Sequence, residues 1–83
     1  MSETFNAWKA RTMARLGAIM RNVNDPRARN HVNNLVVKLG ELRARDIASF
    51  ILYLILIFDE LGMRELLDLI PSEEDLESWL KSD

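Results

Sequence analysis

The amino-acid sequence predicts an all-α protein, a small bundle of about four to five helices with a central, highly apolar third helix. Three observations lead to this prediction. Apolar residues recur at spacings of three and four, which is the period of an amphipathic helix. Helix caps and chain breakers divide the 83 residues into short segments. Only one segment could be read as a β-strand, and a lone strand has no partner for its backbone hydrogen bonds.

The first two expected helices are separated by Asn-Asp-Pro at residues 24–26. The first helix carries a continuous apolar stripe: Phe5, Trp8, Thr12, Met13, Leu16, Ile19, Met20 and Val23. Asp25 is suited to cap the second helix because its carboxylate accepts from free backbone N–H groups, and Pro26 suits the first helical position. The second helix is expected to run to about Arg43. Its apolar stripe is Val32, Leu35, Val36, Leu39 and Leu42.

The third expected helix, Ile47 to Leu61, is the most apolar part of the chain. Asp46 provides an N-cap and Gly62 a C-terminal stop. Its residues are also strong strand formers, but its length, its flanking caps and the lack of a second strand favour a helix. A helix that is apolar on all sides must be covered on all sides, so we expect it to run through the centre of the bundle. If it does not, an exposed apolar patch would indicate a homodimer or a larger partner.

The remaining segments are short. Residues Met63 to Ile70 predict a fourth helix that Pro71 ends. Ser72 with Asp75 resembles a capping box that opens a last amphipathic turn or two. That turn carries Leu76, Trp79 and Leu80.

The chain is expected to form one helical domain over residues 1–83, with residues 72–83 as a candidate partner-binding tail. A chain of this length lies near the lower limit for a self-sufficient core. Gly17 and Gly40 lie inside expected helices, where each is less favourable than alanine by about 1 kcal/mol. Glycine at these positions therefore predicts a close approach of neighbouring helices.

Composition narrows the class of function. There is no cysteine, which excludes disulfides and thiol chemistry and fits a reducing, cytoplasmic setting. The first ten residues carry no apolar signal stretch, and the longest apolar run falls short of the ~20 residues that span a bilayer, so we expect no membrane contact. His31 has no histidine or cysteine companion for a metal site. The sequence contains no glycine-rich phosphate loop and no nucleophile–base arrangement, so it predicts a non-enzymatic protein with no cofactor.

Charge is distributed unevenly along the chain. Residues 1–45 hold nine basic and three acidic side chains, a net +6, and residues 46–83 hold two basic and ten acidic ones, a net −8. Such an asymmetry is typical of proteins that bind nucleic acid or acidic partners, although the two halves could also neutralise each other within the fold. Non-specific contact with the nucleic-acid backbone is the first interpretation. The predicted contact residues are Lys9, Arg11, Arg15, Arg27 and Arg29.

The C-terminal run EEDLESWLK, residues 73–81, resembles the sliding-clamp (PCNA) interaction box of archaeal and eukaryotic replication proteins. The likeness is closest over residues 76–79, which are similar to the tails of archaeal flap endonucleases. The box departs from the usual pattern at Glu73, where glutamine is expected, and at Leu80, which replaces the second aromatic residue. The resemblance implies a helical turn that inserts Leu76, Trp79 and Leu80 into a hydrophobic pocket of the clamp. The alternative is that these three side chains pack on the chain's own core.

These features together predict an accessory or adaptor protein of a DNA replication or repair assembly. Its partner would be a larger protein, a DNA polymerase or a sliding clamp. The size and helical make-up are compatible with the small accessory subunits of crenarchaeal replicative polymerases. The alternative function is a homodimeric structural or regulatory protein, of viral or cellular origin, with no nucleic-acid role. In that case Trp79 belongs to the core, and the basic and acidic halves pair between subunits.

Overall fold

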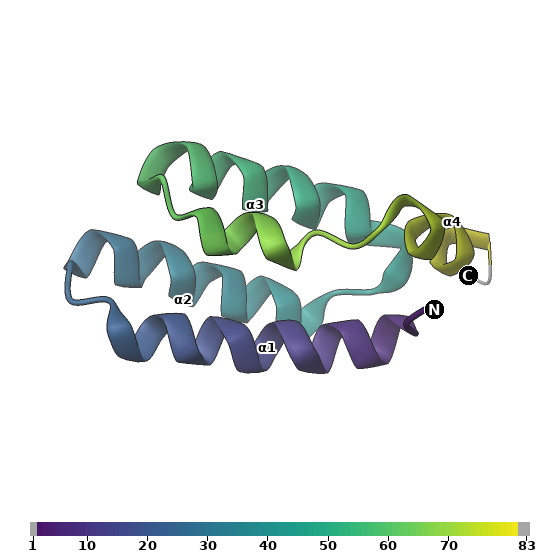
Figure 1. The fold of residues 1–83 in the computed structure, drawn as a ribbon, viewed down its shortest axis with the longest axis horizontal. Helices are drawn as coiled ribbons and strands as arrows, with labels where there is room; N and C mark the ends of the chain where they lie inside the picture. The colour runs from purple at the N-terminus through teal and green to yellow at the C-terminus, as the bar shows by residue number, and fades with distance from the viewer. Residues whose placement is uncertain (1, 82–83) are drawn as a thin grey trace.

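Six helical segments follow one another along the chain in the computed structural model, which describes residues 2–81. They are α1 (Phe5–Asn22), α2 (Pro26–Glu41), the 3-10 helix η1 (Ala44–Asp46), α3 (Ile47–Leu61), the 3-10 helix η2 (Arg64–Leu69) and α4 (Glu73–Lys81). No strand occurs among the described residues, so the predicted all-α fold is confirmed. Figure 1 shows α1 and α2 side by side, α3 along the opposite edge and α4 at the end of the bundle near the N-terminus. The bundle is elongated, with extents of 39 × 23 × 21 Å.

The core lies between the inner faces of these segments. Its fully buried large side chains come from every long element except α4, which adds the nearly buried Trp79. The most buried apolar members are Trp8, Leu16, Val32, Leu35, Leu39, Ile47, Leu54, Leu66 and Leu69. The predicted stripes of the first two helices therefore face inward, as helical periodicity requires.

The start of α2 agrees with the sequence prediction. The Asp25 carboxylate accepts a hydrogen bond from the Arg27 N–H at 3.2 Å, and Pro26 occupies the first turn. The helix ends at Glu41, before the expected Arg43, because the Leu42 N–H closes a tighter bond to the Leu39 carbonyl. Helix ends commonly tighten in this way.

The bounds of α3 are those predicted, Ile47–Leu61. Gly62 ends the helix in the left-handed conformation, with φ 68°, and its N–H donates to the Phe58 carbonyl. Asp46 occupies the predicted N-cap position of α3, but its side chain makes no capping hydrogen bond there. The chain enters α3 directly from η1, and the Asp46 carboxylate instead pairs with Arg43 at 3.5 Å.

The last two segments differ in detail from expectation. The fourth helix expected over residues 63–70 is the 3-10 helix η2, whose ends are fixed by backbone bonds from Leu66 to Met63 and from Ile70 to Leu67. Half of the capping box at the start of α4 forms, because the Asp75 N–H donates to Ser72 Oγ at 3.1 Å. The Asp75 carboxylate accepts from the Glu3 N–H at 3.2 Å, and so it ties α4 to the N-terminal segment.

The glycines inside α1 and α2 do not mark close helix approach, so that prediction is wrong. A Cβ atom added at Gly40 would meet no heavy atom within 4 Å, and one at Gly17 would meet only the flexible end of Arg21 at 4.0 Å. Both glycines have ordinary negative φ values, unlike Gly62.

We therefore expect opposite effects from two Gly→Ala substitutions. Gly40→Ala should raise the free energy of unfolding by about 0.4–1 kcal/mol, because it restricts the unfolded chain and meets open space. Gly62→Ala should lower it by about 1–2 kcal/mol, because alanine is strained at positive φ. Urea unfolding followed by circular dichroism measures both values. A destabilising Gly40→Ala would show that neighbouring atoms do crowd this position.

Candidate functional site

Two of the five predicted nucleic-acid-binding residues satisfy carbonyl groups at helix ends. Lys9 Nζ donates to the carbonyls of Gly40 and Leu42, at 3.3 and 2.9 Å, at the end of α2. The Arg29 guanidinium donates to the carbonyls of Met20 and Val23 at the end of α1. Cations are favoured at helix C-termini because the last carbonyls lack partners and carry partial negative charge.

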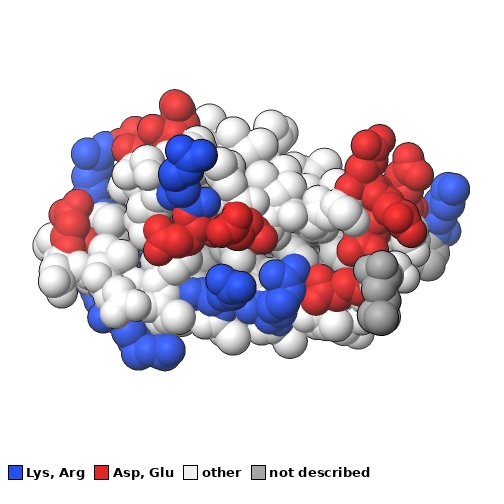
Figure 2. Space-filling model, viewed as in Figure 1, with Lys and Arg blue, Asp and Glu red and all other residues white. Residues whose placement is uncertain are grey.

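Two others form ion pairs within the chain. Arg11 makes a two-pronged contact with the Glu3 carboxylate at 2.9 and 3.0 Å, and Arg27 pairs with Glu60. Arg15 forms no ion pair with the described residues. Figure 2 shows positive and negative side chains interspersed on the face it draws, with no continuous basic patch there. A phosphate would compete with existing bonds at four of the five residues.

The three predicted anchor residues of the tail do not form one exposed face. Trp79 is 4% exposed, Leu76 is half-buried and Leu80 is 50% exposed. The Trp79 indole N–H donates to the Glu3 carbonyl at 2.8 Å, and its ring lies 5.6 Å from that of Trp8. In this fold Trp79 therefore belongs to the core, and a clamp could take it only if α4 left the bundle. Residues 82 and 83 of the tail lie outside the described residues.

The different burial of Trp79 and Leu80 predicts a sharp difference between substitutions at these two neighbouring positions. Trp79→Ala should lower the free energy of unfolding by about 3–5 kcal/mol, because it removes a large buried ring. Leu80→Ala, the matched control, should change it by less than about 1 kcal/mol, because half of that side chain is already in water. Urea unfolding compares the free energies of unfolding of the two variants. Equal stabilities would show that the indole is not part of the core.

Glu3, whose role no sequence motif predicts, joins the N-terminal segment to α1 and α4. Its backbone N–H and C=O bind Asp75 and Trp79, and its carboxylate binds Arg11. The hydrogen bond from Arg11 holds the pKa of the Glu3 carboxyl below its ordinary value, an effect that partial burial opposes and the charge of Arg11 reinforces. The only sequence signal for this role is the presence of an acid eight residues before an arginine.

A carboxyl whose pKa is lowered by folding stabilises the folded state only while it is ionised. The Glu3 contribution is fully present above the pKa of the unfolded chain and is lost as pH falls through the lower pKa of the folded state. We therefore expect wild type to be more stable than Glu3→Gln at about pH 7 and the difference to vanish at about pH 2. Urea unfolding of both proteins at both pH values measures this difference in the free energy of unfolding. A difference that does not change with pH would contradict an ionic role for Glu3.

The principal exposed feature is the outer face of α3. Leu52, Ile55 and Leu56 are 63%, 41% and 64% exposed, while the buried residues of α3 lie on its inner face. Spacings of three and four place the three side chains together, and we name them the α3 stripe. The expectation of a central third helix is wrong on this point, because the other segments cover α3 only on its inner side. Figure 2 shows the edge that α3 forms as uncharged along most of its length.

The other exposed large apolar side chains of the described residues occur singly, one on each of three elements. Val37, Leu67 and Leu80 come from α2, η2 and α4 respectively. Single exposed apolar residues are normal on protein surfaces, whereas several on one helix face are not. The α3 stripe is therefore the strongest candidate for a binding surface.

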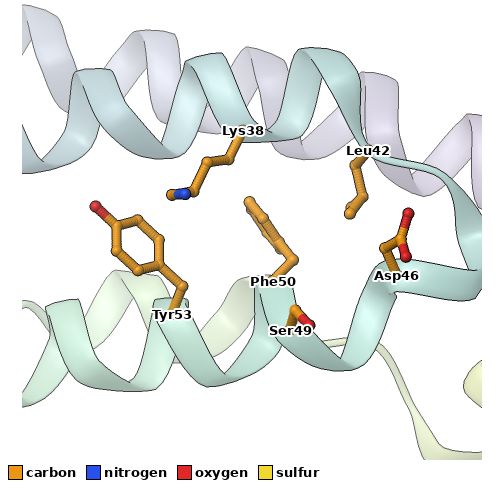
Figure 3. A pocket seen from close by; sticks show the side chains of 6 residues that line it. All are labelled: Lys38, Leu42, Asp46, Ser49, Phe50 and Tyr53. Atoms are coloured by element: carbon orange, nitrogen blue, oxygen red, sulfur yellow. The ribbon is translucent and has the colours of Figure 1, made fainter.

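A shallow groove of about 280 Å³ adjoins this surface between α2 and α3. Figure 3 shows the side chains that line it: Lys38, Leu42, Asp46, Ser49, Phe50 and Tyr53. Lys38 Nζ lies 4.8 Å from the centre of the Tyr53 ring, a cation–π contact. The groove is at the lower end of ligand-pocket sizes, ~300 Å³ and above, and suits a single side chain of a partner.

Within residues 2–81, no three histidine, cysteine or acidic side chains gather closely enough to hold a metal ion. None of the helices in this part of the chain combines the length and the apolar character needed to cross a bilayer. No protein-family model, curated protein or solved structure matches the chain.

Proposed function

We propose that this chain is a non-enzymatic protein-interaction module that docks onto a partner protein through the α3 stripe. The observation that carries the proposal is the joint exposure of Leu52, Ile55 and Leu56 on one face of one helix. Contiguous exposed apolar side chains of this kind are typical of protein interfaces. Presenting one apolar helix face to a partner is also a common mode of recognition.

Binding at the α3 stripe would be favourable because the partner would remove its apolar surface from water. Full burial of a leucine or isoleucine contributes about 1.5–3 kcal/mol relative to full exposure. Since the three side chains are between two-fifths and two-thirds exposed, covering them would contribute on the order of 3 kcal/mol for this side of the interface. The stripe is also rigid, because the inner face of the same helix is anchored in the core by Phe50, Leu54 and Ile57. A rigid surface binds at a lower entropic cost than a mobile one.

The role in DNA replication or repair, with a polymerase or sliding clamp as partner, stays a prediction from the sequence. The fold supports it less directly than it supports protein binding through α3. Lys9, Arg11, Arg27 and Arg29 are engaged within the chain, and Trp79 is buried. Nucleic-acid binding by the remaining exposed arginines would appear as affinity for DNA that falls steeply with salt.

Photo-crosslinking in the native cell tests the proposal. A photoreactive phenylalanine analogue replaces Leu52 or Leu56 in separate variants, and Asn33, exposed on α2, in a control variant. We expect covalent protein adducts from positions 52 and 56 but not from position 33, because only the former lie in the interface. Mass spectrometry of the adducts identifies the partner, including a second copy of the chain.

A stability measurement accompanies each variant. Circular dichroism should show unchanged helicity, because the replaced side chains project outward. Folded variants whose adducts at positions 52 and 56 do not exceed those at position 33 would overturn the assignment of α3 as the docking surface.

A further inference from the structure

Charge and side-chain size differ between the two ends of the α3 stripe, and this difference indicates which partner would bind there. We propose that the stripe binds the same stripe of a second copy of this chain, with the two α3 helices antiparallel and a two-fold axis at Leu52. This inference rests on the proposed function, because it names the partner of the same surface.

The exposed charges before and after the α3 stripe favour an antiparallel pair. Leu52 and Asp59 are seven residues apart, which is two turns of α3, so they share its outer face. Arg45 lies seven residues before Leu52, in the 3-10 helix η1 that leads directly into α3. Arg45 and Asp59 are exposed, and neither forms an ion pair with the described residues. Their neighbours Arg43 and Glu60 are already paired within the chain. The run formed by η1 and α3 therefore carries an exposed positive charge before the α3 stripe and an exposed negative charge after it.

Only an antiparallel pair satisfies both charges. Rotation about an axis at Leu52 places Arg45 opposite Asp59 of the second copy, and it does so twice because of the symmetry. A parallel pair would place Arg45 against Arg45 and Asp59 against Asp59, and such like-charge contacts are unfavourable at interfaces. The dipoles of antiparallel helices also oppose each other favourably.

The sizes of the exposed side chains on α3 favour the same antiparallel pair. The half of the face before Leu52 carries small exposed residues, Ala48 and Ser49, and the half after it carries Ile55 and Leu56. About an axis at Leu52, Ala48 faces Leu56 of the second copy and Ser49 faces its Ile55. Large side chains thus meet small ones, which fills space without overlap. A parallel pair would crowd one half and leave the other half empty.

The groove beside α3 fits the same arrangement. Ser49 lines it together with Lys38 and Tyr53 (Figure 3). Because Ile55 of the second copy faces Ser49, it lies at the mouth of this groove. The groove is then an extension of the dimer interface and receives part of an apolar side chain.

The expected dimer is weak. An interface formed mainly by one 15-residue helix from each copy is at the low end of interface sizes, below ~1,200 Å² in total. We expect a dissociation constant on the order of 10–100 µM, with association that weakens as salt screens the two charge pairs. An isologous two-fold contact is closed, so no species larger than the dimer should form.

Sedimentation equilibrium of the full chain from about 5 to about 500 µM tests these expectations. Wild type should show a monomer–dimer equilibrium. Arg45→Glu and Asp59→Arg should each weaken it by about tenfold or more, because each change creates two like-charge contacts. The double variant carrying both changes should return to within about threefold of wild type, because the charges are then exchanged and complementary again. Arg21→Glu, at the far end of α1, is the matched control and should have no effect.

A cysteine variant gives a direct geometric test. The chain contains no cysteine, so Leu52→Cys introduces a single thiol at the proposed axis. Oxidation should link two copies of this variant through a disulfide and should not link Asn33→Cys, which lies on the exposed side of α2.

Three results would overturn the inference. The first is a wild-type chain that stays monomeric at about 500 µM. The second is a dimer that the single charge reversals leave unchanged or that the double variant does not restore. The third is a photo-crosslink from position 56 to a different protein while the chain itself is monomeric. That last result would leave the proposed function standing, because α3 would still be the docking surface.

Discussion

The arrangement of the other elements depends on the contacts of one side chain, the indole of Trp8. It is fully buried on α1, and its ring lies 5.9 Å from Phe50 of α3 and 5.6 Å from Trp79 of α4. Its N–H donates to the Leu69 carbonyl, at the end of η2, at 2.8 Å. A buried indole N–H needs an acceptor, so this one bond fixes where η2 ends against α1. Four elements therefore meet at a single side chain.

The small size of the chain also leaves α3 partly uncovered. A chain of 83 residues has little apolar surface to spare, and here α1, the inner face of α3, η2 and α4 meet at the aromatic cluster of Phe5, Trp8, Phe50 and Trp79. Phe50 and Leu54 are covered as a result, while Leu52 and Leu56, on the other side of the same helix, are not. The exposed stripe is a consequence of how much core a bundle of this length can enclose, and it is the surface through which we propose that the chain assembles.

Several basic residues of the first half of the chain form hydrogen bonds and ion pairs within the fold. Lys9 and Arg29 satisfy carbonyls at the ends of α2 and α1, and Arg27 reaches across to Glu60 at the end of α3. These bonds connect residues that are distant along the chain, so the uneven distribution of charge in the sequence becomes a mixture of both signs on the folded surface. Arg45 and Asp59, which have no ion pair among the described residues, flank the α3 stripe.

The sequence by itself determined the elements whose limits follow local rules. Asp25 with Pro26 began α2 and Gly62 ended α3, because capping bonds and allowed backbone angles involve only neighbouring residues. The tertiary structure decided which face of α3 is covered and whether Trp79 is core or anchor. The bond between Trp79 and Glu3 joins residues 76 positions apart, and no spacing within a helix encodes it. Helical periodicity specifies that an apolar face must be buried, but when a helix is apolar on every side, only the packing of the other elements selects the side that stays in water.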